Sequence, residues 1–207
     1  MVYAVVAAFA VMAGCYLAFQ RMKRAPRRSQ ALHIALKCAA TGMAVLVALL
    51  GCLKNGAAPH WIMLAGLVAC TIADGVLCVH FLAGGAIFAL GHVLYMAAFL
   101  LMHRPTFASA LLFLALMGLC TAAYTRFRAR IGRRFAFFYA YATVLCLMVS
   151  MAAAQAPLYF AGALLFAFSD AALGYLLVDR NHLRLDYISL AAYYLGQFLL
   201  ALAVFVG

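Results

Sequence analysis

The sequence predicts an all-α integral membrane protein whose eight transmembrane helices form a single domain over residues 1–207. The first observation is composition: 71% of the 207 residues are hydrophobic and 9% are charged, whereas a soluble domain carries about 25% charged residues. The second observation is a mean hydropathy of +1.11. The third is that proline, glycine and charged residues divide the chain into apolar runs of about 20 residues, the length that spans a bilayer.

The first four runs are separated by a basic segment, by a connector that holds Lys54, and by a glycine pair. The first run has no basic residues before it, so we interpret it as a helix and not as a cleaved signal peptide. Gly84 and Gly85 lie at the junction of the third and fourth runs, which no charge marks. The expected helices are 2–20, 31–53, 60–80 and 83–103.

The last four runs have clearer limits. Arg104 precedes the fifth run, and a second basic segment separates the fifth run from the sixth. Pro157 opens the seventh run, as proline does at the first turn of many helices, and a charged connector separates the seventh from the eighth. The expected helices are 106–125, 135–154, 157–178 and 186–206.

The connectors predict an orientation, because basic residues gather in those that follow the first, fifth and seventh runs. The opposite side holds Lys54 and Arg104, so by the positive-inside rule both termini face away from the cytoplasm. We expect Lys37 to extend its ammonium group back to the basic side. The basic connectors contain Arg21, Lys23, Arg24, Arg27, Arg28, Arg126, Arg128, Arg130, Arg133, Arg134, Arg180 and Arg184, with Asp179 and Asp186 as solvated surface charges.

The net charge of +11 does not indicate a nucleic-acid partner, since positive charge in short connectors sets topology. We expect membrane lipid as the partner and a bacterial inner membrane as the location. The seven cysteines are irregularly spaced, without a Cys-x-x-Cys or Cys/His pattern, so we predict neither a metal site nor a cofactor. No pattern in the chain specifies an oligomeric state.

Two of the four acidic residues, Asp74 and Asp170, lie inside apolar runs. A carboxylate in hydrocarbon costs several kcal/mol unless it is neutral, paired or hydrated, so such residues indicate function. Their helices run in the same direction, and both acids lie about 20 Å from the outer helix ends at 1.5 Å per residue. We therefore predict a shared functional site. The Asp-x-x-Leu pattern at both acids suggests that two parallel four-helix repeats make up the chain.

Other polar residues reach a similar level and are the expected substrate-binding groups. His92 and Tyr95 share a helix face, as do Tyr193 and Gln197. Each has a structural alternative: tyrosine forms interfacial belts, a lone histidine packs in a core, and glutamine bridges helices. The expected binding residues are His92, Tyr95, Tyr139, Ser169, Tyr193, Tyr194 and Gln197.

These segments resemble the YhhN-type, lysoplasmalogenase-like membrane proteins. Asp74–Leu77 followed by Gly91–Phe99 is similar to the family's third and fourth helices, Gly162–Leu173 to its seventh and Tyr193–Gln197 to its last. The family often has glycine before the first aspartate, where this chain has Ala73. The resemblance implies eight helices and hydrolysis of the vinyl-ether bond of lysoplasmalogens, which are lysophospholipids, to a fatty aldehyde and a glycerophospho-headgroup.

The residues suit that chemistry. A vinyl ether is cleaved by protonation of a carbon, which gives an oxocarbenium-like cation that water attacks. The site therefore needs one carboxylic acid that keeps its proton and one carboxylate that stabilises the cation or activates water. Repulsion between two acids in a medium of low dielectric favours such a division of roles. The sequence leaves open which aspartate is the acid.

Two other functions use paired intramembrane acids. A proton-coupled transporter or a lipid-binding membrane protein would also need them, and repeated halves are common in transporters. An intramembrane aspartyl protease also has two facing aspartates, but the Tyr-Asp and Gly-x-Gly-Asp signatures of that class are absent around Asp74 and Asp170. The sequence therefore favours the hydrolase.

Overall fold

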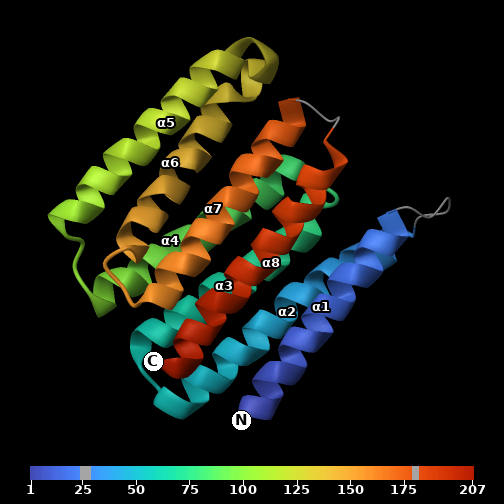
Figure 1. The fold of residues 1–207 in the computed structure, drawn as a ribbon, viewed down its shortest axis with the longest axis vertical. Helices are drawn as coiled ribbons and strands as arrows, with labels where there is room; N and C mark the ends of the chain where they lie inside the picture. The colour runs from blue at the N-terminus through green and yellow to red at the C-terminus, as the bar shows by residue number, and fades with distance from the viewer. Residues whose placement is uncertain (24–28, 179–181) are drawn as a thin grey trace.

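The computed structural model describes residues 1–23, 29–178 and 182–207, and these residues form a helical bundle (Figure 1). Eight of its helices are long and apolar enough to cross a membrane, which confirms the predicted fold class. Arg24, Arg27, Arg28, Asp179 and Arg180 lie outside the described residues. The helices are α1 (Val2–Lys23), α2 (Gln30–Asn55), α3 (Ala58–Leu77), α4 (Phe81–Met102), α5 (Phe107–Ile131), η1 (Gly132–Arg134), α6 (Phe135–Ala152), α7 (Pro157–Val178) and α8 (Leu183–Val206).

Local chemistry explains several helix ends. Thr106 and Ser109 form a capping box that satisfies backbone N–H groups at the start of α5. Gly56 ends α2 in the left-handed region, with φ of 61°, a conformation that glycine adopts at low cost. Gly132 ends α5, also with φ of 61°. Because arginine is a good helix former, α5 continues through Arg128 beyond the expected end at residue 125.

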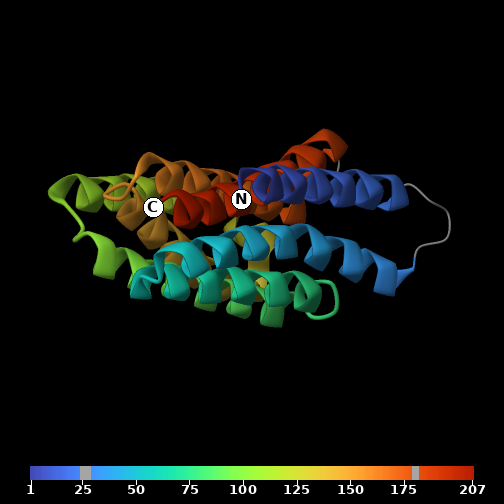
Figure 2. The same ribbon diagram turned by 90° about the horizontal axis from the view of Figure 1, so that it is seen from below.

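The helices form two hairpins that are flanked in equivalent ways. α3 packs against α4, and α7 packs against α8. α2 then packs against α8, and α6 packs against α4, so each hairpin receives one helix from the other half of the chain. Figure 2 shows α2, α3 and α4 in one layer and α1, α7 and α8 in the other. Both termini lie at the same end of the bundle (Figure 1), while the side of the membrane they face stays a prediction.

Glycines allow the two hairpins to pack closely at matching positions. A Cβ atom on Gly66 would lie 3.2 Å from the carbonyl oxygen of Gly91. A Cβ atom on Gly162 would lie 2.9 Å from the carbonyl oxygen of Gly196. In each hairpin the acid follows its glycine by 8 residues, from 66 to 74 and from 162 to 170. The hairpins thus repeat one backbone plan, in agreement with two parallel four-helix repeats.

Candidate functional site

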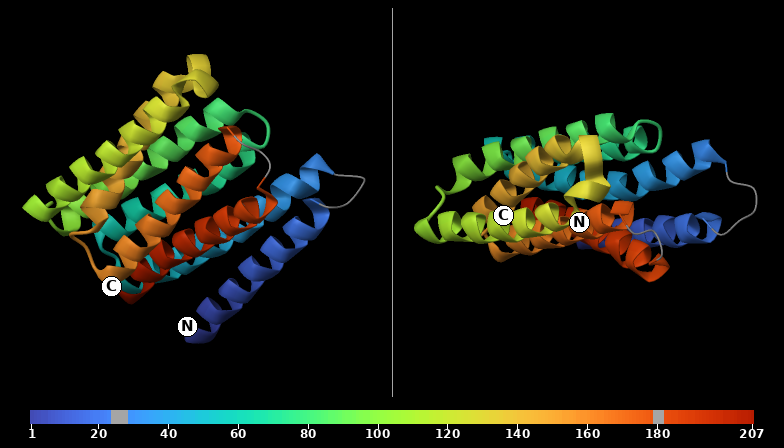
Figure 3. Two further views of the ribbon diagram at one scale, coloured as in Figure 1. Left: turned by 45° about the horizontal axis from the view of Figure 1, so that its top comes forward. Right: turned by 90° about the horizontal axis from the view of Figure 1, so that it is seen from above.

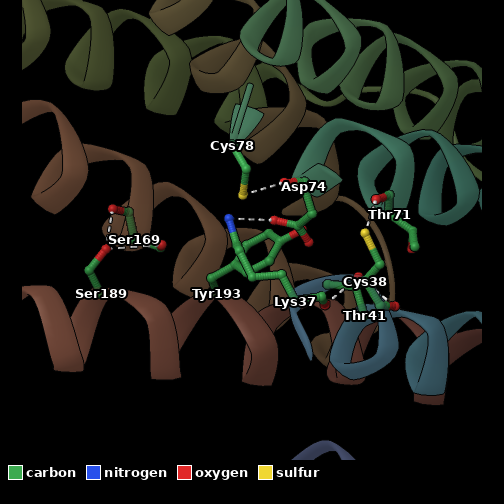
Figure 4. A network of polar contacts seen from close by, with 9 residues as sticks. All are labelled: Lys37, Cys38, Thr41, Thr71, Asp74, Cys78, Ser169, Ser189 and Tyr193. Atoms are coloured by element: carbon green, nitrogen blue, oxygen red, sulfur yellow. Dashed lines mark hydrogen bonds and ion pairs between the residues drawn. The ribbon is translucent and has the colours of Figure 1, made fainter. Parts of the chain in front are cut away.

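Asp74, in the last turn of α3, forms an ion pair inside the bundle. One carboxylate oxygen of Asp74 lies 3.1 Å from Nζ of Lys37 on α2, and the other accepts a hydrogen bond of 2.8 Å from the Tyr193 hydroxyl on α8. Figure 4 shows the lysine and the tyrosine converging on this carboxylate. Asp74 is 1% exposed and Lys37 9%. The expectation that Lys37 extends to the basic side is therefore wrong: an opposite charge inside the protein holds its ammonium group.

Small side chains bring α2 close enough to α3 for this pair to form. A Cβ atom on Gly75 would lie 3.3 Å from Sγ of Cys38, and that thiol is 3.6 Å from the Thr71 carbonyl oxygen. The thiol of Cys78, just beyond α3, donates to the Asp74 carbonyl oxygen at 3.3 Å. Burial raises the pKa of Cys78, so the thiol keeps the proton it donates. The ion pair therefore lies where two helices meet closely.

Asp170, on α7, has neutral partners. It accepts a hydrogen bond from the Tyr141 hydroxyl of α6, and that hydroxyl lies 3.2 Å from Nε2 of His92 on α4. Asp170 is partly exposed, whereas His92 is fully buried. Within the described residues, no ion pair involves Asp170. Three helices thus form a chain of exchangeable protons that ends at this carboxyl group.

The partners of the two acids share one aromatic neighbour, Phe166. Its ring centroid is 5.2 Å from that of Tyr193 and 4.6 Å from that of His92. Phe88 also contacts Phe166 and Tyr193, at 5.9 Å and 5.8 Å between centroids. The aromatic rings therefore connect the two acid clusters. Among the described residues, no hydrogen bond joins the two carboxyl groups directly.

The acids occupy matching positions in their hairpins but differ in distance from the helix ends. Asp74 lies 3 residues before Leu77, the last residue of α3, or about 4.5 Å along the axis. Asp170 lies 8 residues before Val178, the last residue of α7, or about 12 Å. From the outer helix ends, Asp74 lies 16 residues after Ala58 and Asp170 lies 13 residues after Pro157, or about 24 Å and about 20 Å along the axes. The two acids therefore match in their position relative to the glycine contacts, and α7 extends further toward the basic end.

A third polar cluster borders the site. The Tyr95 hydroxyl donates to Oε1 of Gln197 at 3.1 Å and lies 3.5 Å from Sγ of Cys70. Among the described residues, Nε2 of Gln197, Nδ1 of His92 and the Tyr194 hydroxyl are buried without a hydrogen-bond partner. A buried polar group left without a partner costs about 1–3 kcal/mol. These three groups are therefore suited to bind water or the polar atoms of a bound molecule.

The remaining predicted binding residues divide into two groups. Ser169 joins α7 to α8, because its carbonyl oxygen accepts a hydrogen bond of 2.9 Å from the Ser189 hydroxyl (Figure 4). Tyr139 is not brought to the acids: its hydroxyl lies 2.8 Å from Oγ1 of Thr121 on α5. Tyr141 has the position expected of Tyr139. It lies two residues further along α6, about 200° around a helix of 3.6 residues per turn, so spacing alone could not choose between them.

Residues Lys37 and Tyr141 were missed as site residues. Lys37 had a usable signal, since a lysine inside an apolar run is as costly as an aspartate there. Among the described residues, no group of three or more His, Cys, Asp or Glu side chains lies close enough to hold a metal ion. The site is thus built from two carboxyl groups, one ammonium group, hydroxyls, an imidazole and an amide.

The model of the YhhN family matches residues 32–204, a range that includes Lys37, both acids and all of their described partners. Searches of curated proteins and of solved structures found no significant match.

Proposed function

Because the chain belongs to the YhhN family, we propose that it is a membrane hydrolase that cleaves the vinyl-ether bond of lysoplasmalogen-type lysolipids. Family membership supports a lysoplasmalogenase-like function at the level of the family. The observation that carries the assignment to this site is the unequal pairing of two intramembrane acids. Asp74 has a cation as its partner, and Asp170 has a tyrosine.

In the first step, Asp170 is the general acid. A carboxylate without a cationic partner is costly in a medium of low dielectric, so this acid is held with its proton. The Asp170 carboxyl proton moves to the vinyl carbon remote from the ether oxygen. The C–H bond forms with the electron pair of the double bond, and the positive charge is shared by the ether oxygen and its neighbouring carbon. Asp170 is left as a carboxylate.

In the second step, Asp74 is the general base. Lys37 favours the carboxylate form of Asp74 by direct charge pairing. A water molecule attacks the cationic carbon, and Asp74 accepts the proton that the water loses. The product is a neutral hemiacetal, and Asp74 now holds the proton.

Collapse of the hemiacetal exchanges the two roles again. Asp74 returns its proton to the ether oxygen as the carbon–oxygen bond breaks, and Asp170 takes the proton of the hemiacetal hydroxyl. The aldehyde and the glycerophospho-alcohol leave, and both acids are back in their starting forms without any other proton donor. Retaining glycosidases also use a carboxyl group alternately as acid and base at an oxocarbenium-like centre, which is an analogy of chemistry alone.

Purified protein in detergent with a lysoplasmalogen, followed by aldehyde release, tests the proposal. We expect Asp170→Asn to lower kcat by at least about 10²-fold, because general acid catalysis contributes that much. Asp74→Asn alone leaves the buried ammonium group of Lys37 unpaired, which destabilises the fold. The double variant Asp74→Asn with Lys37→Met removes both charges, so it should fold and should also be inactive. Asp186→Asn is the matched control, since Asp186 pairs with Lys23 and not with the described partners of either intramembrane acid. Wild-type turnover in Asp170→Asn would disprove the two-acid mechanism.

The buried Lys37–Asp74 pair favours one alternative function, a proton-coupled transporter. Buried pairs of opposite charge also occur in proton-coupled transporters, which are often built from repeats. Liposomes that contain the protein distinguish the two functions. Aldehyde release without a pH change across the membrane supports the hydrolase, whereas solute flux coupled to a pH gradient, with no bond cleaved, supports transport.

A further inference from the structure

The face of α7 beyond Asp170 is open toward the basic end of the bundle. Gly174 follows Asp170 by one helical turn and is exposed. A Cβ atom placed on Gly174 would meet no atom of the described residues of other helices within 4 Å. Ala171 is also exposed. Because residues four apart share a helix face, Asp170, itself a partly exposed residue, lies at the inner end of this open strip.

The strip ends near a hollow formed by the end of α7 and the start of α8, which lie at the same end of the bundle as the turn between α5 and α6 (Figure 3). The hollow has a volume of about 610 Å³, within the range of small-molecule sites. Its lining combines apolar side chains with a phenol, an imidazole and a guanidinium group. The lining residues are Tyr175, His182, Leu183, Arg184, Leu185 and Ile188.

Arg184 gives this hollow its charge. The side chain is exposed, and none of the ion pairs within the described residues involves it. Asp186, two residues further on, is held by Lys23 at 2.7 Å instead. A guanidinium group binds phosphate through two parallel hydrogen bonds, so the hollow is suited to a phosphate group with an apolar chain attached.

The spacing from the hollow to the acid fits one class of ligand. Tyr175 follows Asp170 by 5 residues, which is about 7.5 Å along the helix axis. In a lysoplasmalogen, seven covalent bonds of roughly 1.5 Å separate the phosphorus atom from the vinyl carbon that Asp170 protonates, and in an extended chain they span about 8–9 Å. A phosphate in the hollow would therefore bring the vinyl ether to the level of Asp170.

We propose that the hollow lined by Tyr175 and Arg184 binds the phosphate headgroup of the lysolipid substrate, and that the open strip at Gly174 carries its glycerol backbone to Asp170. This subsite rests on the proposed hydrolase function and adds where the substrate lies. It also gives Arg184 a role in substrate binding, in addition to its contribution to membrane orientation.

Two substrates test the headgroup subsite: a lysoplasmalogen and a 1-alkenylglycerol, which carries the same vinyl ether without phosphate. Arg184→Gln should raise KM for the lysoplasmalogen by roughly tenfold or more, the loss expected for a charge-assisted pair, and leave kcat within about twofold. Its kinetics with the alkenylglycerol should equal those of the wild type. Arg130→Gln, an exposed arginine on α5 at the same end of the bundle, is the control and should change neither. Arg184→Lys should restore part of the affinity.

A second variant tests the strip independently. Gly174→Phe places a large ring in open space, so it should fold normally and lower kcat/KM for both substrates by roughly tenfold or more, because misplacing a reacting group is costly. Gly14→Phe is the matched control, since a Cβ at Gly14 of α1 also meets no described residue within 4 Å. Gly174→Ala, with one added methyl group, should remain active.

The outcomes separate the two proposals. If the wild type releases no aldehyde from either substrate, the hydrolase proposal and this subsite both fail. If the wild type is active but Arg184→Gln and Gly174→Phe behave like their controls, the hydrolase stands and the subsite is overturned. An equal rise in KM of Arg184→Gln for both substrates would also overturn the subsite, because Arg184 would then not recognise the phosphate.

Discussion

The two halves of the molecule position their acids in the same way but neutralise them differently. Asp74 and Asp170 each follow, by eight residues, a glycine that packs against the next helix. α2 then supplies a lysine to the first acid, whereas α6 supplies a tyrosine to the second. A repeated backbone with unequal partners gives two carboxyl groups different environments, as acid–base catalysis by a pair requires.

The exchange of helices between the halves explains how the difference arises. α8, from the second half, supplies Tyr193 to Asp74, and α4, from the first half, supplies His92 to the chain that ends at Asp170. Phe88 and Tyr193 each precede the contact glycine of their helix by 3 residues, and their rings touch. Each acid cluster is therefore completed by the other hairpin, so each half depends on the other for a partner of its acid.

The largest expected effect comes from removing the cation of the first half. Lys37→Met leaves Asp74 as an uncompensated buried charge, which should lower the free energy of unfolding by about 3–5 kcal/mol and abolish activity. The measurement is thermal unfolding in detergent together with aldehyde release. Adding Asp74→Asn should recover stability to within about 1–2 kcal/mol without recovering activity. If Lys37→Met alone were as stable as the wild type, the ion pair would not stabilise the first half of the bundle.

A smaller effect is expected where the hairpins pack through glycine. Gly162→Ala would place Cβ 2.9 Å from a backbone oxygen of Gly196, so α7 and α8 must separate, at a cost of about 1–3 kcal/mol. Gly66→Ala meets the Tyr95 ring at 2.4 Å, so it should also break the hydrogen bond from Tyr95 to Gln197. Gly118→Ala is the control, because its Cβ would have no neighbour within 4 Å in the described part of the chain. The free energies of unfolding of the three variants, compared pairwise, would show whether the two glycine contacts contribute equally to stability.

The two tyrosines that bind the acids should differ in their effect on turnover. Tyr141→Phe removes the hydroxyl between Asp170 and His92, so kcat should fall by roughly tenfold or more, with a stability loss of about 1 kcal/mol. Tyr193→Phe should reduce kcat less, because Lys37 still holds the Asp74 carboxylate. Single-turnover aldehyde release measures both. If the order of the two effects were reversed, the roles of acid and base would have to be exchanged.

The sequence predicted much of the fold because hydropathy is a property of each residue separately. Eight apolar runs became eight helices, and the two acids were recognisable because ionised groups in hydrocarbon are costly. The partners were harder to predict. The hydropathy of α4 to α7 differs little from one face to another, so no amphipathic pattern shows which face of these helices is inside. The choice of Tyr141 over Tyr139, and the inward direction of Lys37, depend on which helices pack together, and this information is not local.

The smallest expected effect concerns a second lysine–aspartate pair, which serves as a reference for the first. Lys23 and Asp186 are 2.7 Å apart, and their side chains are 26% and 36% exposed. Water screens this pair, so Asp186→Asn should change the free energy of unfolding by no more than about 1 kcal/mol and leave turnover unchanged. The measurement is unfolding at low and at high salt, where the small difference should shrink. Since the chemical groups and the contact distance nearly match those of Lys37 and Asp74, a large effect here would mean that burial is not what distinguishes the two pairs.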